Sequence, residues 1–245
     1  MTTKNLIDSG MEEFLGNQRL LMISPHADDE TAGCGGLIRR IKQAGGEAYV
    51  MVMSTGNLDH FDGKKSDVVA STRADELADA MKVLGVDDFE ILWPEDDLHL
   101  RLDTLPRKEL INQIERQARL CTEKIQPTMI ILPAPSFNQD HEAVYKAGIT
   151  ACRPHLASLK AFQRMVLIAD APQLSWAKEV FKPTLYVDIS DCLETKLEAY
   201  RQHRSQQRPA PHQGGVEALR FLAKMRGTEI SVEAAEAYEV ARFVI

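Results

Sequence analysis

The sequence has no long hydrophobic segment. No apolar run approaches the roughly 18 residues of a membrane-spanning helix. The N-terminal stretch MTTKNLIDSGMEEFLGNQ also lacks the apolar core behind basic residues that marks a secretory signal. We therefore expect a cytoplasmic protein with no membrane span.

Paired cysteines and an excess of positive charge are also absent. The 29 basic and 36 acidic side chains give a formal net charge of -7 with no basic stripe, which disfavours nucleic acid as a partner. The cysteines are scattered and form no C-x-x-C pair, which argues against a disulfide framework and a thiolate zinc site; they are Cys34, Cys121, Cys152 and Cys192. A small molecule is the expected partner, and a homo-oligomer is compatible with the sequence.

Apolar runs of strand length alternate with helical patterns along the chain. Their continuous apolar character predicts burial on both faces, and between them apolar residues recur every three or four positions, as in helices. This alternation predicts an α/β fold, a Rossmann-like and mostly parallel sheet with helices on both faces, in a single domain over residues 1–245. The apolar runs lie at 19–24, 48–54, 88–93, 128–134, 164–169 and 184–189.

The end of the chain is less regular. Residues 203–215, HRSQQRPAPHQGG, are polar and rich in proline and glycine, so they are predicted to form a long loop. Two closing helices are predicted after it, over 216–226 and 231–242.

The stretch PHADDE places a histidine and two adjacent aspartates where the first predicted strand meets the first predicted helix. Open α/β sheets bind ligands at the carboxyl ends of their strands. His26, Asp28 and Asp29 are therefore candidates for a site in which one aspartate holds a metal and its neighbour faces a water molecule. Alternatively, Asp29 or Thr31 caps the helix and His26 is a loop residue. Two unpaired acids side by side favour the metal, because like charges need a compensating cation.

A second polar cluster, SFNQDHEAV at 136–144, also follows a predicted strand. His141 is positioned to complete a site with His26 and one aspartate, which gives three protein ligands and an open position, as in catalytic zinc centres. Asp140 either supports such a site or is the N-cap of the following helix.

With these motifs the sequence resembles the PIG-L/LmbE-like family of zinc-dependent N-deacetylases. The family signature pairs a P-H-x-D-D-E motif with a later H-x-D-H-type motif. Further segments resemble the family in the same order, namely ETAGCGGLI, RADELADAMKVLG, FKPTLYVDIS and KLEAYRQHRSQ. The likeness spans most of the chain. It implies hydrolysis of the acetamide of an N-acetylated amino sugar or glycoconjugate, which releases acetate and a free amine.

The resemblance also implies roles for individual residues. It implies one zinc ion per chain, held by His26, Asp29 and His141, with Asp28 as the general base. Bound zinc lowers the pKa of water to about 7, so a neighbouring carboxylate can accept its proton.

Two further residues are implied to contact the substrate. Arg73 is one of them. The alternative role for Arg73 is an ion pair with Glu76 on a solvated helix face. Asp97, in PEDDLHL, loosely matches an acidic family position that contacts sugar hydroxyls, and is otherwise part of a solvated loop.

One position departs from the family pattern. Asn138 stands where the second motif often begins with histidine, and asparagine can donate a hydrogen bond to an oxyanion but cannot titrate near neutral pH. Either Asn138 is a neutral donor or another histidine does that work. His203 and His212, in the late loop, are candidates for which a solvated surface role is expected, and His60 lies beyond another strand end.

Other functions fit parts of the pattern. His26, Asp28 and His141 would also form the 2-His-1-carboxylate site of a non-haem iron oxygenase, although those enzymes resemble all-β jelly rolls. A catalytically degenerate sugar-binding member of the family is a second alternative, supported by Asn138 and opposed by Asp28. Metal-assisted phosphoester hydrolysis usually needs more carboxylates, to hold two ions. We therefore predict a deacetylase that acts on a soluble acetamido sugar.

Overall fold

The apolar runs form a seven-stranded sheet with the order β3-β2-β1-β4-β5-β7-β6. The computed structural model describes residues 3–57, 68–156, 158–176 and 180–244. Strands β1 to β5 pair in parallel, and β7 is antiparallel to both of its neighbours, which confirms the mostly parallel α/β sheet. The strands are β1 (Arg19–His26), β2 (Glu47–Ser54), β3 (Asp88–Trp93), β4 (Met129–Pro133), β5 (Met165–Ala169), β6 (Leu185–Asp188) and β7 (Ala235–Phe243).

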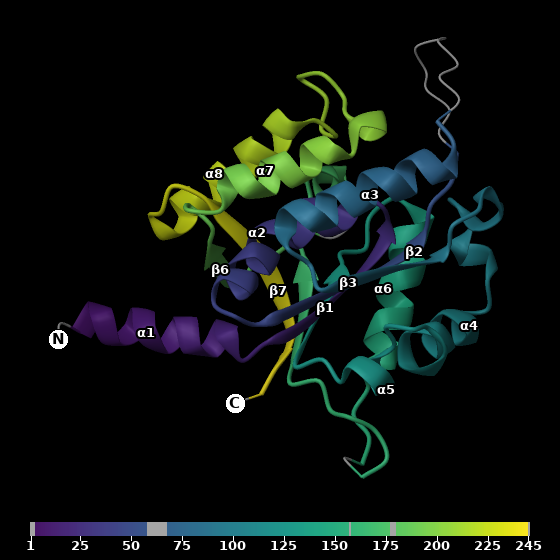
Figure 1. Ribbon diagram of the computed structural model, residues 1–245, viewed down its shortest axis with the longest axis horizontal. Coiled ribbons are helices and arrows are strands. Elements are labelled where there is room, and N and C mark those ends of the chain that lie inside the picture. Colours follow the sequence, from purple (N-terminus) through teal and green to yellow (C-terminus); the bar gives the residue numbers. More distant parts are fainter. Residues whose placement is uncertain (1–2, 58–67, 157, 177–179, 245) are drawn as a thin grey trace.

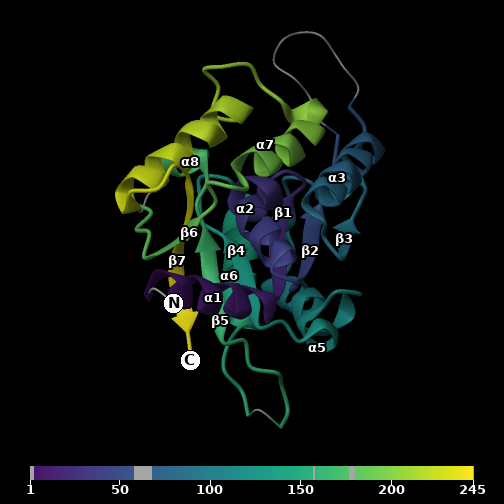
Figure 2. The same ribbon diagram turned by 60° about the vertical axis from the view of Figure 1, so that its left-hand side comes forward.

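Helices cover both faces of this sheet (Figures 1 and 2). One face carries α2 (Asp29–Gln43), α3 (Ala70–Leu84), α7 (Leu193–Gln202) and α8 (Val216–Ile230), and α1 (Thr3–Gly16) contacts α2. The other face carries α4 (Arg107–Asn112), α5 (Thr122–Ile125) and α6 (Gln139–Ala151).

In strand β1, apolar residues do not alternate with polar ones, because both faces of the strand are covered. Leu20 and Met22 pack in the apolar cluster under α2, whereas Leu21 and Ile23 pack in the cluster under α6. Successive side chains of a strand point to opposite faces, and both faces of β1 are covered, so every position after Arg19 is buried.

The helix predicted at 231–242 is wrong. Helix α8 extends to Ile230, and residues Ala235–Phe243 form strand β7 between β5 and β6. The segment is rich in alanine and glutamate, which favour helices when a helix is isolated. Pairing with two strands, together with burial of Tyr238, outweighs that weak local preference.

Within the described ranges, no helix is both long enough and apolar enough to cross a membrane. All four cysteines are buried and free, as expected of packed thiols rather than a disulfide framework.

Candidate metal centre and active site

The candidate site lies at the carboxyl ends of two adjacent parallel strands. Strand β1 ends at His26, and α2 begins at Asp29. Strand β1 pairs with β2 on one side and with β4 on the other, so the chain connections diverge here, which is where α/β sheets bind ligands. The first turn of α6, after β4, brings Asp140 and His141 to the same edge.

His26, Asp29 and His141 bring their ligand atoms within 4.8 Å of one another. Asp29 Oδ2 lies 3.2 Å from His141 Nε2 and 3.5 Å from His26 Nδ1. Both histidines are buried. Two imidazole nitrogens and one carboxylate oxygen are a common ligand set of catalytic zinc centres, which leave a further position for water or substrate. The three residues therefore fit a zinc ion.

Asp140 fixes the orientation of His26. It is fully buried, its Oδ2 lies 2.8 Å from His26 Nε2, and its Oδ1 accepts a hydrogen bond from the amide of Leu102. Because a carboxylate only accepts, a neutral His26 carries its proton on Nε2 and has its Nδ1 lone pair free for a metal. Carboxylates hold metal-ligating imidazoles in place in this way.

The charges of the cluster favour a cation. Burial opposes protonation of His26, yet hydrogen bonds to Asp140 and Asp29 raise its pKa to about 9. Burial alone would raise the pKa of Asp29, but His141 and His26 lower it below its usual value. The buried carboxylates thus attract positive charge, and a metal ion can replace protons on such ligands.

Asp28 lies beside the cluster in a strained backbone conformation. Its φ is 135° and its ψ is -31°, a combination that residues other than glycine rarely adopt. Such strain costs on the order of 1–3 kcal/mol and concentrates at functional sites. Burial and the neighbouring charge of Asp29 raise the pKa of Asp28 to about 7, against the opposing effects of His203 and Arg73. A carboxyl group with a pKa near neutrality is suited to accept and return a proton.

A cavity of about 290 Å³ opens onto the cluster. This volume is near the roughly 300 Å³ at the lower end of small-molecule pockets. Apart from the cluster and Asp28, its wall combines polar side chains with an exposed aromatic ring; they include Asn138, Gln173, Gln206, His212, Gln213, Tyr200 and Phe137.

Asn138 is the N-cap of α6, and Asp140 is not. The Asn138 side-chain oxygen accepts a hydrogen bond from the Asp140 amide over 2.9 Å, which satisfies one of the free N–H groups at the helix start. Asn138 also lines the cavity. Its oxygen is committed to the backbone, so its side-chain N–H groups remain to donate to a ligand.

The alternative role predicted for Arg73, a solvated ion pair with Glu76, is wrong. Arg73 is only 1% exposed, because it reaches inward from α3 to the cavity wall. Its guanidinium donates to Gly56 O and to the Gln206 side-chain oxygen, and lies 3.0 Å from His99 Nε2. Glu76 instead accepts hydrogen bonds from Ser205.

Asp97 does not line the cavity, whereas His99, two residues later, does. Asp97 is exposed, as in the solvated-loop alternative. The His99 ring lies edge-on to His26 at 4.9 Å between centroids, and the sequence prediction missed it. A histidine in a loop after a strand end was the available signal. His60 lies outside the described residues.

His203 is not a surface residue. It is completely buried, and its Nε2 lies 3.0 Å from Glu30 Oε1. Burial alone would lower the pKa of His203, but the Glu30 carboxylate raises it. The net effect is a raised pKa. His212 is exposed, as expected, although it borders the cavity.

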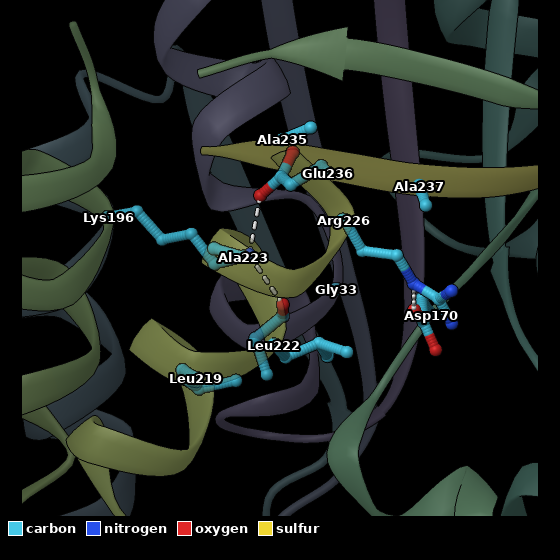
Figure 3. Close-up of a pocket in the computed structure, with 11 residues that line it drawn as sticks. Gly33, Asp170, Lys196, Leu219, Leu222, Ala223, Arg226, Ala235, Glu236 and Ala237 are labelled. Carbon is cyan, nitrogen blue, oxygen red and sulfur yellow. Dashed lines mark hydrogen bonds and ion pairs between the residues drawn. The ribbon is translucent and has the colours of Figure 1, made fainter. Parts of the chain in front are cut away.

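A second, water-sized cavity of about 10 Å³ lies beneath α2, between α7, α8 and β7 (Figure 3). There the buried Lys196 ammonium donates to Glu236 and to Ala32 O. Glu236 also accepts hydrogen bonds from the amides of Gly36 and Leu37, just after the point at which α2 leaves helical geometry, at Cys34. The network satisfies backbone groups of α2, the helix that begins with Asp29.

Fold and site together define an α/β protein with two histidines and an aspartate, placed to fit a metal ion, at the strand ends. The chain belongs to the PIG-L family, whose model, described as GlcNAc-PI de-N-acetylase, matches residues 21–152.

A relative supports this family, and solved structures share the fold. A diacetylchitobiose deacetylase from Thermococcus kodakarensis is 30% identical over 204 residues, which cover 80% of this chain and 72% of the relative. The structure of the N,N'-diacetylchitobiose deacetylase from Pyrococcus horikoshii superposes with a TM-score of 0.68 at 23% identity, and covers 98% of this chain and 93% of that one.

The same fold also carries other chemistry. The 4-carboxy-2-hydroxymuconate hydratase from Pseudomonas putida superposes with a TM-score of 0.69 at 18% identity, and covers 93% of this chain and 98% of that one. The fold alone therefore does not define the reaction, and the site residues must carry that argument.

Proposed function

We propose that the protein is a zinc-dependent N-deacetylase that hydrolyses the acetamide of an N-acetylated amino sugar or glycoconjugate. The cluster of His26, Asp29 and His141, with Asp28 beside it, is the observation that carries this proposal. The family and the deacetylases among its relatives support it.

The metal has a defined task in this chemistry. When bound, zinc lowers the pKa of water and polarises a carbonyl oxygen. His26, Asp29 and His141 would hold it, and Asp140 keeps the His26 ring in orientation through its 2.8 Å contact.

Asp28 carries out the proton transfers. Its carboxylate takes a proton from the attacking water and passes it to the leaving amine. Asn138 remains able to donate a side-chain N–H to the developing oxyanion, because only its oxygen is used as the helix cap. Arg73 lines the cavity and offers donors suited to sugar oxygens.

The substrate we propose is an acetamido sugar. Amide and hydroxyl groups on the cavity wall, such as Gln173, Gln213 and Tyr200, suit sugar hydroxyls, and the exposed Phe137 ring offers an apolar face. The similar proteins include diacetylchitobiose deacetylases, whose named substrate is an N-acetylated sugar.

The oxygenase alternative is not favoured. The ligand set predicted for it used Asp28, whereas the carboxylate that contacts both histidines belongs to Asp29. The mostly parallel sheet with helices on both faces also differs from an all-β jelly roll.

Metal analysis and acetate release together test the proposal. We expect the purified protein to contain about one zinc per chain and to release acetate from at least one member of a panel of N-acetylated sugars. Chelation should abolish acetate release and added zinc should restore it. A zinc-loaded protein that releases no acetate from any member would contradict the proposed reaction, and bound iron would reopen the oxygenase alternative.

A further inference from the structure

The peptide unit between Ala27 and Asp28 is held at both of its polar ends. Its carbonyl oxygen, on Ala27, accepts a hydrogen bond of 2.5 Å from the side-chain nitrogen of Gln206. Its N–H group, on Asp28, donates to Glu30 Oε2 over 2.9 Å. A peptide plane with both ends bound cannot turn without breaking one of these hydrogen bonds.

Chemistry fixes the orientation of the Gln206 amide. The guanidinium of Arg73 can only donate, and it lies 3.0 Å from the Gln206 oxygen. The Ala27 carbonyl can only accept, so the Gln206 nitrogen must face it. Gln206 therefore connects Arg73, on the cavity wall, with the backbone that carries Asp28.

The opposite end of the peptide unit is held by a buried pair. Glu30 is completely buried, and besides the Asp28 amide it accepts a hydrogen bond from Thr31 Oγ1 and is contacted by His203 Nε2. His203 and Gln206 both come from the segment directly after α7, far along the chain from Asp28. One short polar segment thus reaches both ends of the same peptide unit, directly through Gln206 and indirectly through Glu30.

The held conformation is the strained one. Asp28 has a φ of 135°, which persists only where the surroundings enforce it. The direction of the Asp28 carboxylate follows from this backbone, because φ and ψ set where the side chain leaves the chain. Loss of either hydrogen bond would free the peptide plane to turn toward an ordinary conformation, and the carboxylate would then point elsewhere.

We propose that Gln206 is a positioning residue for Asp28, with the pair of Glu30 and His203 as its counterpart at the other end of the peptide unit. This inference rests on the proposed function for its kinetic consequence, but its structural consequence can be tested separately. Misplacement of a reacting group by about 1 Å can lower a rate by about 100-fold, so the effect belongs in kcat rather than KM.

Two substitutions at Gln206 test the proposal. Gln206→Met removes both side-chain hydrogen bonds at nearly constant size and adds no charge. Gln206→Glu keeps an oxygen for Arg73 but cannot donate to Ala27. Because both lose the bond to Ala27, we expect kcat for acetate release to fall by about 10- to 100-fold in each, with KM and zinc content close to those of the wild type.

Gln207→Met is the matched control. Gln207 lies in the same segment, and its side-chain nitrogen donates to the carbonyl oxygens of Tyr200 and His203, so this variant loses backbone hydrogen bonds of the same kind without touching the Ala27–Asp28 peptide. We expect its kcat to stay within about twofold of the wild type. An equal fall of kcat in this variant would assign the effect to loosening of the segment and overturn the proposal.

A crystal structure of Gln206→Met supplies a readout that does not depend on the reaction. We expect the Ala27–Asp28 peptide to turn and the φ of Asp28 to leave the neighbourhood of 135°. An unchanged peptide would overturn the positioning role, whether or not the wild type releases acetate. A wild type without activity beside a turned peptide would instead refute the proposed function and leave the positioning role supported.

Discussion

Two neighbouring carboxylates acquire different properties from their surroundings alone. Asp29 contacts two histidines that lower its pKa, whereas burial and the charge of Asp29 raise the pKa of Asp28 to about 7. Groups whose pKa values are driven apart in this way are suited to separate tasks, one as a permanent anion that holds a metal and one as a proton acceptor.

Substitutions at Asp28 and His141 separate these tasks. Asp28→Asn should keep zinc bound and lower kcat by about 100-fold or more, because loss of a general base typically costs a factor of about 10² to 10⁴. His141→Ala should lose zinc as well as activity. Metal content by mass spectrometry and acetate release check both variants. Zinc lost from Asp28→Asn and kept in His141→Ala would reverse the assignment.

The residues of the site differ in how far the sequence could predict them. His26, Asp28, Asp29 and His141 follow strand ends in short motifs, so their meeting at one sheet edge could be anticipated. The burial of His203 could not, because its polar neighbours in the chain suggested a surface loop. Its partner, Glu30, lies more than a hundred positions away, and only the packing of α7 on α2 brings the two together.

At the scale of elements, the first turn of α6 has two roles. Asn138 caps the helix and also lines the cavity. Asn138→His should keep or raise activity, because histidine can donate to an oxyanion. It should also lower the free energy of unfolding by about 1 kcal/mol, because histidine is a poorer N-cap than asparagine. Acetate release and urea denaturation check the two effects. In the control Asn138→Asp, which can cap the helix, stability should stay near that of the wild type.

A total loss of activity in Asn138→His, with the fold intact, would contradict this expectation. It would mean that the cavity is shaped around the asparagine amide rather than open to either donor.

Glu115, just after α4, binds the segment that follows α6 through two ion pairs. This residue is 6% exposed and contacts Arg153 at 2.6 Å and Lys160 at 2.8 Å. Burial alone would raise the pKa of Glu115, but Lys160 and Arg153 lower it below its usual value. A lowered folded-state pKa contributes stability above the unfolded value of 4.5, and this contribution is lost as the pH falls.

Glu115→Gln should therefore lower the free energy of unfolding by about 1 kcal/mol at neutral pH, a figure reduced for solvent screening because Arg153 is half exposed. The difference from the wild type should shrink as the pH falls below 4.5. Urea denaturation at neutral pH and at a pH below 4.5 measures this difference in the free energy of unfolding. Glu142→Gln is the control, since Glu142 pairs with Lys146 on the surface. A difference that stays constant with pH would contradict the role of the Glu115 charge.

Strand β7 marks the limit of sequence reasoning at the scale of elements. Each of the parallel strands β1 to β5 contains a run of apolar residues, so their number and order of appearance were predictable. Strand β7 contains Glu236, which is buried because Lys196 and the amides of α2 compensate it. An alanine-rich segment with acidic residues has a sequence typical of a helix. Only the distant partners of its buried acid show that it is a strand.

In the whole molecule, the cluster of His26, Asp29 and His141 brings together two parts of the chain that are more than 100 residues apart. His26 ends β1, Asp29 begins α2, and His141 comes from α6 on the opposite face of the sheet. The unfolded chain cannot hold these three groups together, so a metal that binds them stabilises the folded state by mass action.

Zinc should therefore raise the midpoint of thermal unfolding of the metal-free protein. At a zinc concentration about 100 times the dissociation constant, linkage predicts about 2.7 kcal/mol, which corresponds to roughly 5–10 °C for a chain of this size. Differential scanning calorimetry measures the shift. Magnesium should give no comparable increase, because it prefers oxygen ligands to imidazole. The shift should persist in Asp28→Asn and vanish in His141→Ala; an equal shift in both would place the bound zinc outside the cluster of His26, Asp29 and His141.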